Sequence, residues 1–120
     1  MRIFKNTWFT RFADKEDIAD TELKETVNQL EAGQADADLG GGVYKVRVAR
    51  SSEGKSGGYR IIVFFKSEER TFFVYGFAKS ARNNLDQKET REYKALAKKY
   101  LNLSDEIIER ALKSGKFVEI

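Results

Sequence analysis

The sequence has no histidine and no cysteine among its 120 residues. The absence of histidine excludes histidine-based acid–base catalysis, histidine-containing catalytic triads, and metal sites built from Cys and His. The absence of cysteine excludes disulfides, which is compatible with a cytoplasmic protein. Any catalysis must therefore use Lys, Arg, Tyr, Ser, Thr or carboxylate side chains.

Long apolar segments are lacking as well. The longest run, IIVFF at residues 61–65, is far shorter than the about 20 residues that a membrane-spanning helix needs. The N-terminal stretch MRIFKNTWFTRF has no apolar core followed by a small-residue cleavage site, so no signal peptide is expected. We expect one domain over residues 1–120, located in the cytoplasm and without a membrane partner.

Charge is unevenly distributed although the formal net charge is only +3. Residues 14–38 contain nine acidic residues and two lysines, a net charge of −7. Residues 43–66 contain one glutamate and six basic residues, a net charge of +5. The basic residues are Lys45, Arg47, Arg50, Lys55, Arg60 and Lys66. This segment indicates either an anionic ligand, most commonly a nucleic acid, or an ordinary solvated face.

Periodicity predicts helices on both sides of a group of strands. A short strand over residues 1–5 should precede a helix capped at Asn6 or Thr7, and a second helix should run over residues 20–32 and end at Gly33. The segment QADADLGGG (34–42) has turn residues without periodicity and is predicted to be a loop.

The middle of the chain is rich in β-branched and aromatic residues. Strands are expected at residues 43–49, 59–66 and 71–78. The middle strand should pair antiparallel with each of the other two. Helices should follow from about Asp86 to residue 101 and from Ser104 to Gly115, with an apolar tail that docks on the core. The predicted fold class is therefore α+β, a small antiparallel sheet with N-terminal helices packed on it and C-terminal helices.

The segment SSEGKSGGYR (51–60) contains Gly-Lys-Ser after a predicted strand, as phosphate-binding loops of nucleotide-binding proteins do. That motif needs a further glycine at the position of Ala49 and a helix after the serine. The following residues, GGYRIIVFF, are typical of a strand. Both requirements fail, so a hairpin loop is predicted and no small-molecule nucleotide is expected as a partner.

The strands around this loop place cations on one face. Alternation puts Lys45 and Arg47 opposite the apolar side chains of their own strand. Matching the apolar faces of the two strands places Arg47 opposite Arg60 and Lys45 opposite Ile62. Directly opposed like charges are unfavourable, so an anion between them is one explanation and an ordinary solvent-facing strand pair is the other.

Two further basic residues, Lys79 and Arg82, follow the third strand in YGFAKSARNNL, where loops commonly present functional groups. Solubility or capping of nearby carbonyls would also explain them. Asp36 and Asp38 are too sparse for a divalent-cation site, so no metal or other cofactor is expected. Tyr59 and Tyr75 are the better candidates for stacking a base. The other aromatic residues are more typical of a core, namely Trp8, Phe9, Phe12, Phe72, Phe73 and Phe77.

The stretch LGGGVYKVRVARSSEGKSGGYRIIVFF, followed by RTFFVYGFAKSARNNL, resembles the central signature of RelE/HigB-type toxins of bacterial toxin–antitoxin systems. The likeness covers roughly residues 38–101 and, more loosely, the N-terminal helices. It implies a RelE/ParE-like fold and a ribosome-dependent mRNA endonuclease that cuts message in the decoding site. It also implies a cognate antitoxin, expected to be a helix-turn-helix protein, that neutralises the toxin.

Matched position by position, the resemblance implies a set of catalytic residues, namely Lys45, Arg47, Arg60 and Arg82. Cleavage would be metal-independent attack by a ribose 2′-hydroxyl, with Lys45 as the base. Arg47 and Arg60 would hold the phosphate, and Arg82 would assist the leaving oxygen. Further RNA-binding residues are expected, namely Lys79, Lys55, Arg50 and Tyr59.

One departure leaves the stacking aromatic open. Some relatives have a tyrosine shortly after the position of Arg82, whereas NNLDQ follows it here. Two other functions also stay open: a ParE-like inhibitor of DNA gyrase without catalysis, and a non-catalytic RNA-binding module. The cation set argues against the first, because a gyrase inhibitor does not need a phosphate-cleaving cluster.

Overall fold

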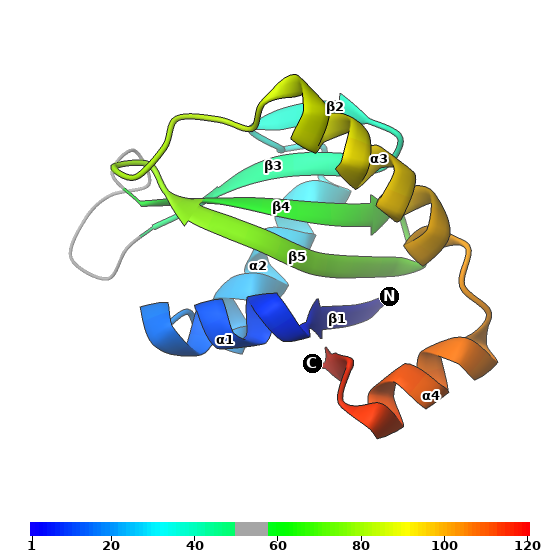
Figure 1. Cartoon of the computed structure of the whole chain (residues 1–120). Helices are drawn as coiled ribbons and strands as arrows, with labels where there is room; N and C mark the ends of the chain where they lie inside the picture. Colours follow the sequence, from blue (N-terminus) through cyan, green and yellow to red (C-terminus); the bar gives the residue numbers. More distant parts are fainter. Residues whose placement is uncertain (50–57) are drawn as a thin grey trace.

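The computed structural model describes residues 1–49 and 58–120, which form helices on both faces of one sheet (Figure 1). The helices are α1 (Thr7–Glu16), α2 (Asp20–Glu31), α3 (Gln87–Leu101) and α4 (Asp105–Ser114). The strands are β1 (Arg2–Asn6), β2 (Ala37–Gly40), β3 (Val43–Val48), β4 (Tyr59–Lys66), β5 (Arg70–Ala78) and β6 (Phe117–Glu119). The α+β class predicted from the sequence is confirmed.

Within the described residues, the sheet has six strands in the order β2-β3-β4-β5-β1-β6. Neighbouring strands are antiparallel except β1 and β5, which are parallel. The predicted antiparallel neighbours β3, β4 and β5 are confirmed. The apolar tail docks as predicted, because β6 pairs with β1 and places Phe117 in the core.

The prediction of a loop over residues 34–42 is wrong in part. Ala37–Gly40 forms β2, an edge strand that pairs with β3. Its four residues, ADLG, include no β-branched or aromatic residue, so its extended form depends on backbone hydrogen bonds to β3. Residues 34–36 and 41–42 lie outside any strand, as predicted, and Gly41 and Gly42 both have a positive φ.

Among the described helices, α1, α3 and α4 begin after a residue whose side chain caps the helix, whereas α2 begins after Ala19, which has no such cap. The Asn6 side chain accepts a hydrogen bond from the backbone N–H of Phe9 at 2.7 Å, which confirms the cap predicted for α1. Asp86 and Glu89 form a reciprocal capping box at the start of α3. At the end of α4, Gly115 adopts the left-handed conformation with a φ of 79°.

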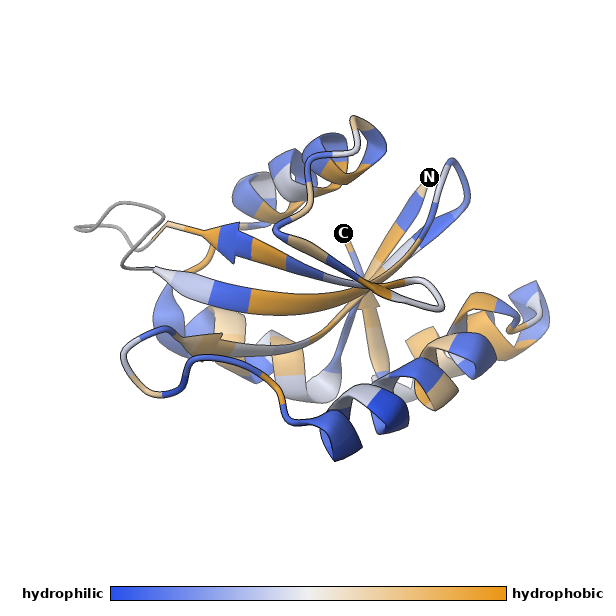
Figure 2. Ribbon diagram, turned by 90° about the horizontal axis from the view of Figure 1, so that it is seen from above, coloured by the Kyte–Doolittle hydropathy of each residue, from blue (hydrophilic) through white to orange (hydrophobic). Residues whose placement is uncertain are grey.

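Each face of the sheet carries its own hydrophobic core. α1 and α2 cover one face, where Phe9 and Leu23 pack on Ile61 and Phe73. α3 and α4 cover the other face, with a core that includes Phe64, Phe72, Ala97 and Ile108. Figure 1 shows α2 behind the sheet and α3 in front of it. In Figure 2 the middle of the sheet is mostly hydrophobic, whereas the helices outside it alternate between hydrophobic and hydrophilic residues.

The second half of β5 has an edge that α1 covers in place of a strand. β1 pairs with β5 only up to Phe73, and α1 then runs alongside the rest of β5 (Figure 1). The helix approaches closely because Gly76 has no side chain: a Cβ there would lie 2.6 Å from Cε2 of Phe12. No helix among the described residues is long and apolar enough to cross a membrane.

We predict that Gly76→Ala destabilises the fold by about 1–3 kcal/mol, because the added methyl group overlaps the Phe12 ring. Urea unfolding followed by circular dichroism measures the change. In the background of Phe12→Leu, which shortens the opposing side chain, the same substitution should cost less. An unchanged unfolding midpoint in Gly76→Ala would show that α1 does not depend on this close approach.

Candidate functional site

Three cations from neighbouring strands gather at one end of the sheet. β3 pairs with β4 in the predicted register, with Arg47 opposite Arg60 and Lys45 opposite Ile62. Ile62 belongs to the core beneath α3, so the three cations lie on the face that α3 partly covers. Arg60 is only 5% exposed, whereas 49% of the Arg47 side chain is accessible. The cluster therefore reaches from within the fold out to solvent.

One carboxylate contacts all three cations. Asp36 lies 2.7 Å from Nε of Arg47 and 3.8 Å from both Nζ of Lys45 and Nε of Arg60. Its backbone N–H donates to the carbonyl of Lys45 at 2.9 Å, which fixes the segment before β2 against β3. Asp36 is thus the anion that the opposed cations require. We call these four side chains (Lys45, Arg47, Arg60 and Asp36) the cation cluster.

The loop after β5 places Arg82 beside the cation cluster. Arg82 donates to both carboxylate oxygens of Glu89, at 2.6 and 3.1 Å, and twice to the carbonyl of Asn84, at 2.8 and 3.1 Å. The Asn84 side chain in turn accepts a hydrogen bond from Nζ of Lys45 at 3.3 Å. Asn84 therefore connects the Arg82 loop to the cluster.

The ion pair between Arg82 and Glu89 shifts the pKa of both groups. Hydrogen bonds from Arg82 and then from the Asp86 backbone lower the pKa of Glu89 to about 2. Glu89, followed by the hydroxyl of Tyr75, raises the pKa of Arg82. The guanidinium also lies 5.3 Å from the centroid of the Phe77 ring, a cation–π contact. Arg82 is therefore held in one orientation.

The residues predicted to bind RNA or stack a base lie in different environments. Lys79 is exposed in the turn after β5. Tyr59 is only 3% exposed and meets the Phe12 ring edge-on, on the face of the sheet away from the cluster, so a base could reach it only if the core opened. Tyr75 lies on the face of the cluster, directly across from Ile62. Arg50 and Lys55 lie outside the described residues.

Asp36, Asn84 and Glu89 were not identified from the sequence as site residues. The sequence pattern presents Asp36 only as a residue too isolated for a metal site. Its role as a counter-ion depends on the pairing of β2 with β3. Glu89 was detectable in principle, because it stands three residues after the N-cap Asp86, where capping boxes have a glutamate. Its pairing with Arg82 depends on the path of the loop, which no local pattern shows.

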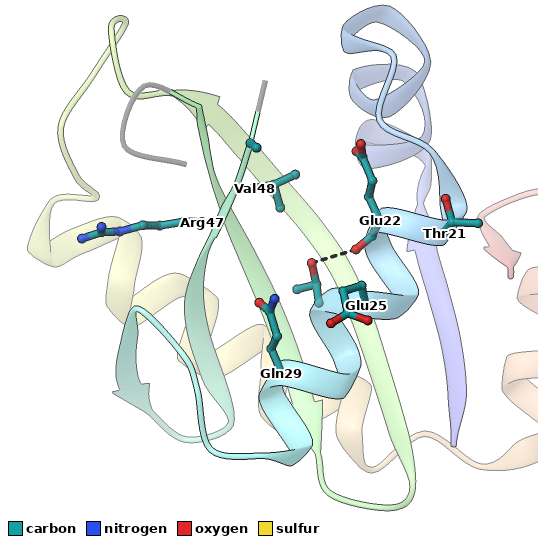
Figure 3. A pocket seen from close by; sticks show the side chains of 8 residues that line it. Thr21, Glu22, Glu25, Gln29, Arg47 and Val48 are labelled. Atoms are coloured by element: carbon teal, nitrogen blue, oxygen red, sulfur yellow. Dashed lines mark hydrogen bonds between the residues drawn. The ribbon is translucent and has the colours of Figure 1, made fainter. Parts of the chain in front are cut away.

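A separate hollow between α2 and the end of β3 does not suit an anion. Thr21, Glu22, Glu25 and Gln29 line one side of it (Figure 3). Its two carboxylates would repel phosphate, and the Arg47 side chain points away from it in the same view. In the part of the chain that the structure describes, no group of three or more carboxylates could hold a metal ion.

We predict that Asp36→Asn destabilises the protein by about 1–3 kcal/mol at low salt, because the cations lose their shared counter-ion. Thermal unfolding measures the loss, which should shrink as sodium chloride screens the cations from one another. Asp38→Asn is the control, because the Asp38 side chain accepts a hydrogen bond from the backbone of Gly40 and forms no ion pair with a cation among the described residues. Equal effects of the two variants would show that Asp36 has no special role in the cluster.

The low pKa of Glu89 predicts a pH-dependent contribution to stability. The folded state favours the ionised carboxylate, so its contribution is complete above pH ~5 and is lost as the pH falls toward about 2. Glu89→Gln should therefore have a shallower decline in unfolding free energy across this interval than the unmodified chain. Glu92→Gln, an exposed position on the same helix, is the control. Identical pH profiles for the unmodified chain and Glu89→Gln would contradict the ion pair.

The amino-acid sequence matches a known family model over residues 1–120. A family model described as the RelE toxin of the RelE/RelB toxin–antitoxin system matches residues 1–120. The match includes the two strands of the cation cluster and the loop that carries Arg82. It confirms the resemblance seen in the central strands and in the N-terminal helices, and it covers α4 as well. The chain therefore belongs to the RelE family of toxins of toxin–antitoxin systems.

Proposed function

We propose that the protein is an endoribonuclease that cleaves mRNA in the decoding site of the ribosome and is neutralised by a cognate antitoxin protein. Toxins of this family are generally mRNA interferases, which supports this reaction class. Such an enzyme would work in the cytoplasm, where ribosomes and message are found. The observation that carries the proposal is the cation cluster around a single anionic position.

A carboxylate and a phosphate make similar demands on their partners. Both accept hydrogen bonds from arginine in a planar, two-point geometry, and both are stabilised by a nearby ammonium group. The position of Asp36 therefore indicates where an RNA phosphate can be held. Arg47 is the half-exposed member of the cluster, so an incoming phosphate would meet it first and compete with Asp36 for its guanidinium.

The proposed reaction needs no histidine. Lys45 takes the proton from a ribose 2′-hydroxyl, and the 2′-oxygen attacks the adjacent phosphorus. The bond from phosphorus to the 5′-oxygen of the next nucleotide breaks, leaving a 2′,3′-cyclic phosphate and a 5′-hydroxyl. Arg47 and Arg60 stabilise the negative charge on the phosphoryl oxygens in the transition state. Arg82 donates a hydrogen bond to the leaving 5′-oxygen, which takes its proton from water.

The position of Arg82 favours an assisting role over direct phosphate binding. Its guanidinium already donates to Glu89 and Asn84, so only part of its hydrogen-bonding capacity is open to RNA. Asn84 also bonds to Lys45, so the proposed base and Arg82 are held by the same residue. This shared contact fixes the spacing between the two groups, which act at the attacking 2′-oxygen and at the leaving 5′-oxygen, on opposite sides of the phosphorus.

We predict that Arg60→Ala and Arg47→Ala each reduce cleavage of ribosome-bound message by at least about 100-fold, because each removes transition-state charge stabilisation. Primer extension on message from purified ribosomes measures the cleavage. Arg47 is exposed, so its variant tests catalysis even if loss of the buried Arg60 affects folding. Arg110→Ala is the control, because Arg110 is exposed on α4 and pairs with Glu106.

Three results would contradict this proposal. Undiminished cleavage in both cluster variants would place the site elsewhere. Intact message combined with inhibited supercoiling by DNA gyrase would indicate the ParE-like activity. Loss of cleavage on chelation, restored by a metal that the ribosome does not itself require, would indicate a metal-dependent nuclease.

A further inference from the structure

A large aromatic side chain lies open on the surface near the cation cluster. Trp8, on the first turn of α1, is 43% exposed. Its ring stacks on Phe12 at 5.2 Å with an interplanar angle of 17°, and its centroid lies 4.6 Å from that of Tyr75. Phe12 is itself held by its close approach to Gly76. The indole therefore rests on a fixed base while part of it stays accessible to a ligand.

Cations lie on the same side of α1 as this ring. Trp8, Arg11, Phe12 and Lys15 follow one another at helical spacing and, with Thr7, line one surface hollow. Arg11 and Lys15 are exposed. Aromatic rings interleaved with basic side chains are the combination with which proteins bind single-stranded nucleic acids. A site for an apolar protein segment would not need the two cations.

Tyr75, whose ring contacts Trp8, lies on the same face of the sheet as the cation cluster. Tyr75 stands across from Ile62 on β4, and Ile62 stands across from Lys45 on β3, all on one face. Two strand spacings, about 10 Å, thus separate the Cα positions of Tyr75 and Lys45. The hydroxyl of Tyr75 also contributes to the raised pKa of Arg82. An RNA strand with one phosphate bound at the cluster can therefore extend past Tyr75 onto α1.

We propose that Trp8 and Tyr75 form a binding site for an unpaired RNA base, while Arg11 and Lys15 contact the backbone phosphates beside it. The RNA strand is the one whose phosphate enters the cation cluster, so the assignment of substrate rests on the proposed function. A base within a duplex cannot offer its face to the indole, which restricts the site to single-stranded RNA. The site takes the role of the stacking tyrosine that the loop after Arg82 does not provide.

The experiment uses the fact that Trp8 is the only tryptophan of the chain, so that its fluorescence reports on this site alone. The probe is a short, fully 2′-O-methylated oligoribonucleotide, which cannot be cleaved, added without ribosomes. We expect the oligonucleotide to quench Trp8 saturably. Inorganic polyphosphate, a polyanion without bases, should bind the cations and leave the fluorescence unchanged.

Variants test the contribution of each part through the anisotropy of a labelled oligonucleotide. Trp8→Ala should weaken binding by about tenfold or more, with Trp8→Phe retaining part of the affinity. Replacing Arg11 and Lys15 with Ala should weaken binding and reduce its dependence on salt. Ile107→Ala, which removes another exposed apolar side chain (47% exposed) from α4, should bind as the unmodified chain does. Thermal unfolding verifies that each variant is folded.

Two outcomes would overturn this inference. Saturating RNA that leaves Trp8 fluorescence unchanged, while Arg47→Ala abolishes RNA binding, would show that the strand does not pass over α1. Fluorescence that responds to a partner protein and not to RNA would assign the surface to protein recognition. Either outcome is compatible with cleavage of ribosome-bound message, and saturable quenching is compatible with its absence, so the two proposals fail separately.

Discussion

The opposition of Arg47 and Arg60 across β3 and β4 is the constraint on which the site depends. The apolar faces of the two strands set this register, because a slip of one residue would turn the cations into the core and the core residues outward. Packing thus forces two guanidinium groups together, and a nearby carboxylate becomes necessary. Asp36 supplies it, and the segment before β2 is held where its side chain can reach all three cations.

The features that the sequence predicts are those that depend on local patterns, and the ones it misses depend on contacts between distant segments. The register, the three central strands and the capped helix ends follow from alternation and from single capping residues, which are local properties. The strand β2 does not, since its extended form is imposed by β3. The ion pairs of Asp36 and of Glu89 join segments far apart in the chain, and their partners become evident only when the strands and the loop after β5 are in place.

The helices decide which part of the sheet stays accessible. α3 covers the face of the cation cluster only from Gln87 onward, and the loop before it brings Arg82 and Asn84 to the uncovered end. α1 covers the other face and also lies along the open edge of β5, so Trp8 contacts Tyr75 on the cluster side. A surface of cations and aromatic rings thereby runs across the boundary between the two hydrophobic cores.

The pairing of β1 has a consequence for the order of folding. β1 lies between β5 and β6, and its Phe4 stands across from Phe72 on one side and Glu119 on the other. The first strand to leave the ribosome therefore has no partner until more than half of the chain has been made, and its second partner comes last. Pairing over such sequence separations makes folding slow. The cation cluster, built from a continuous middle segment of the chain, can form before the sheet that supports it is complete.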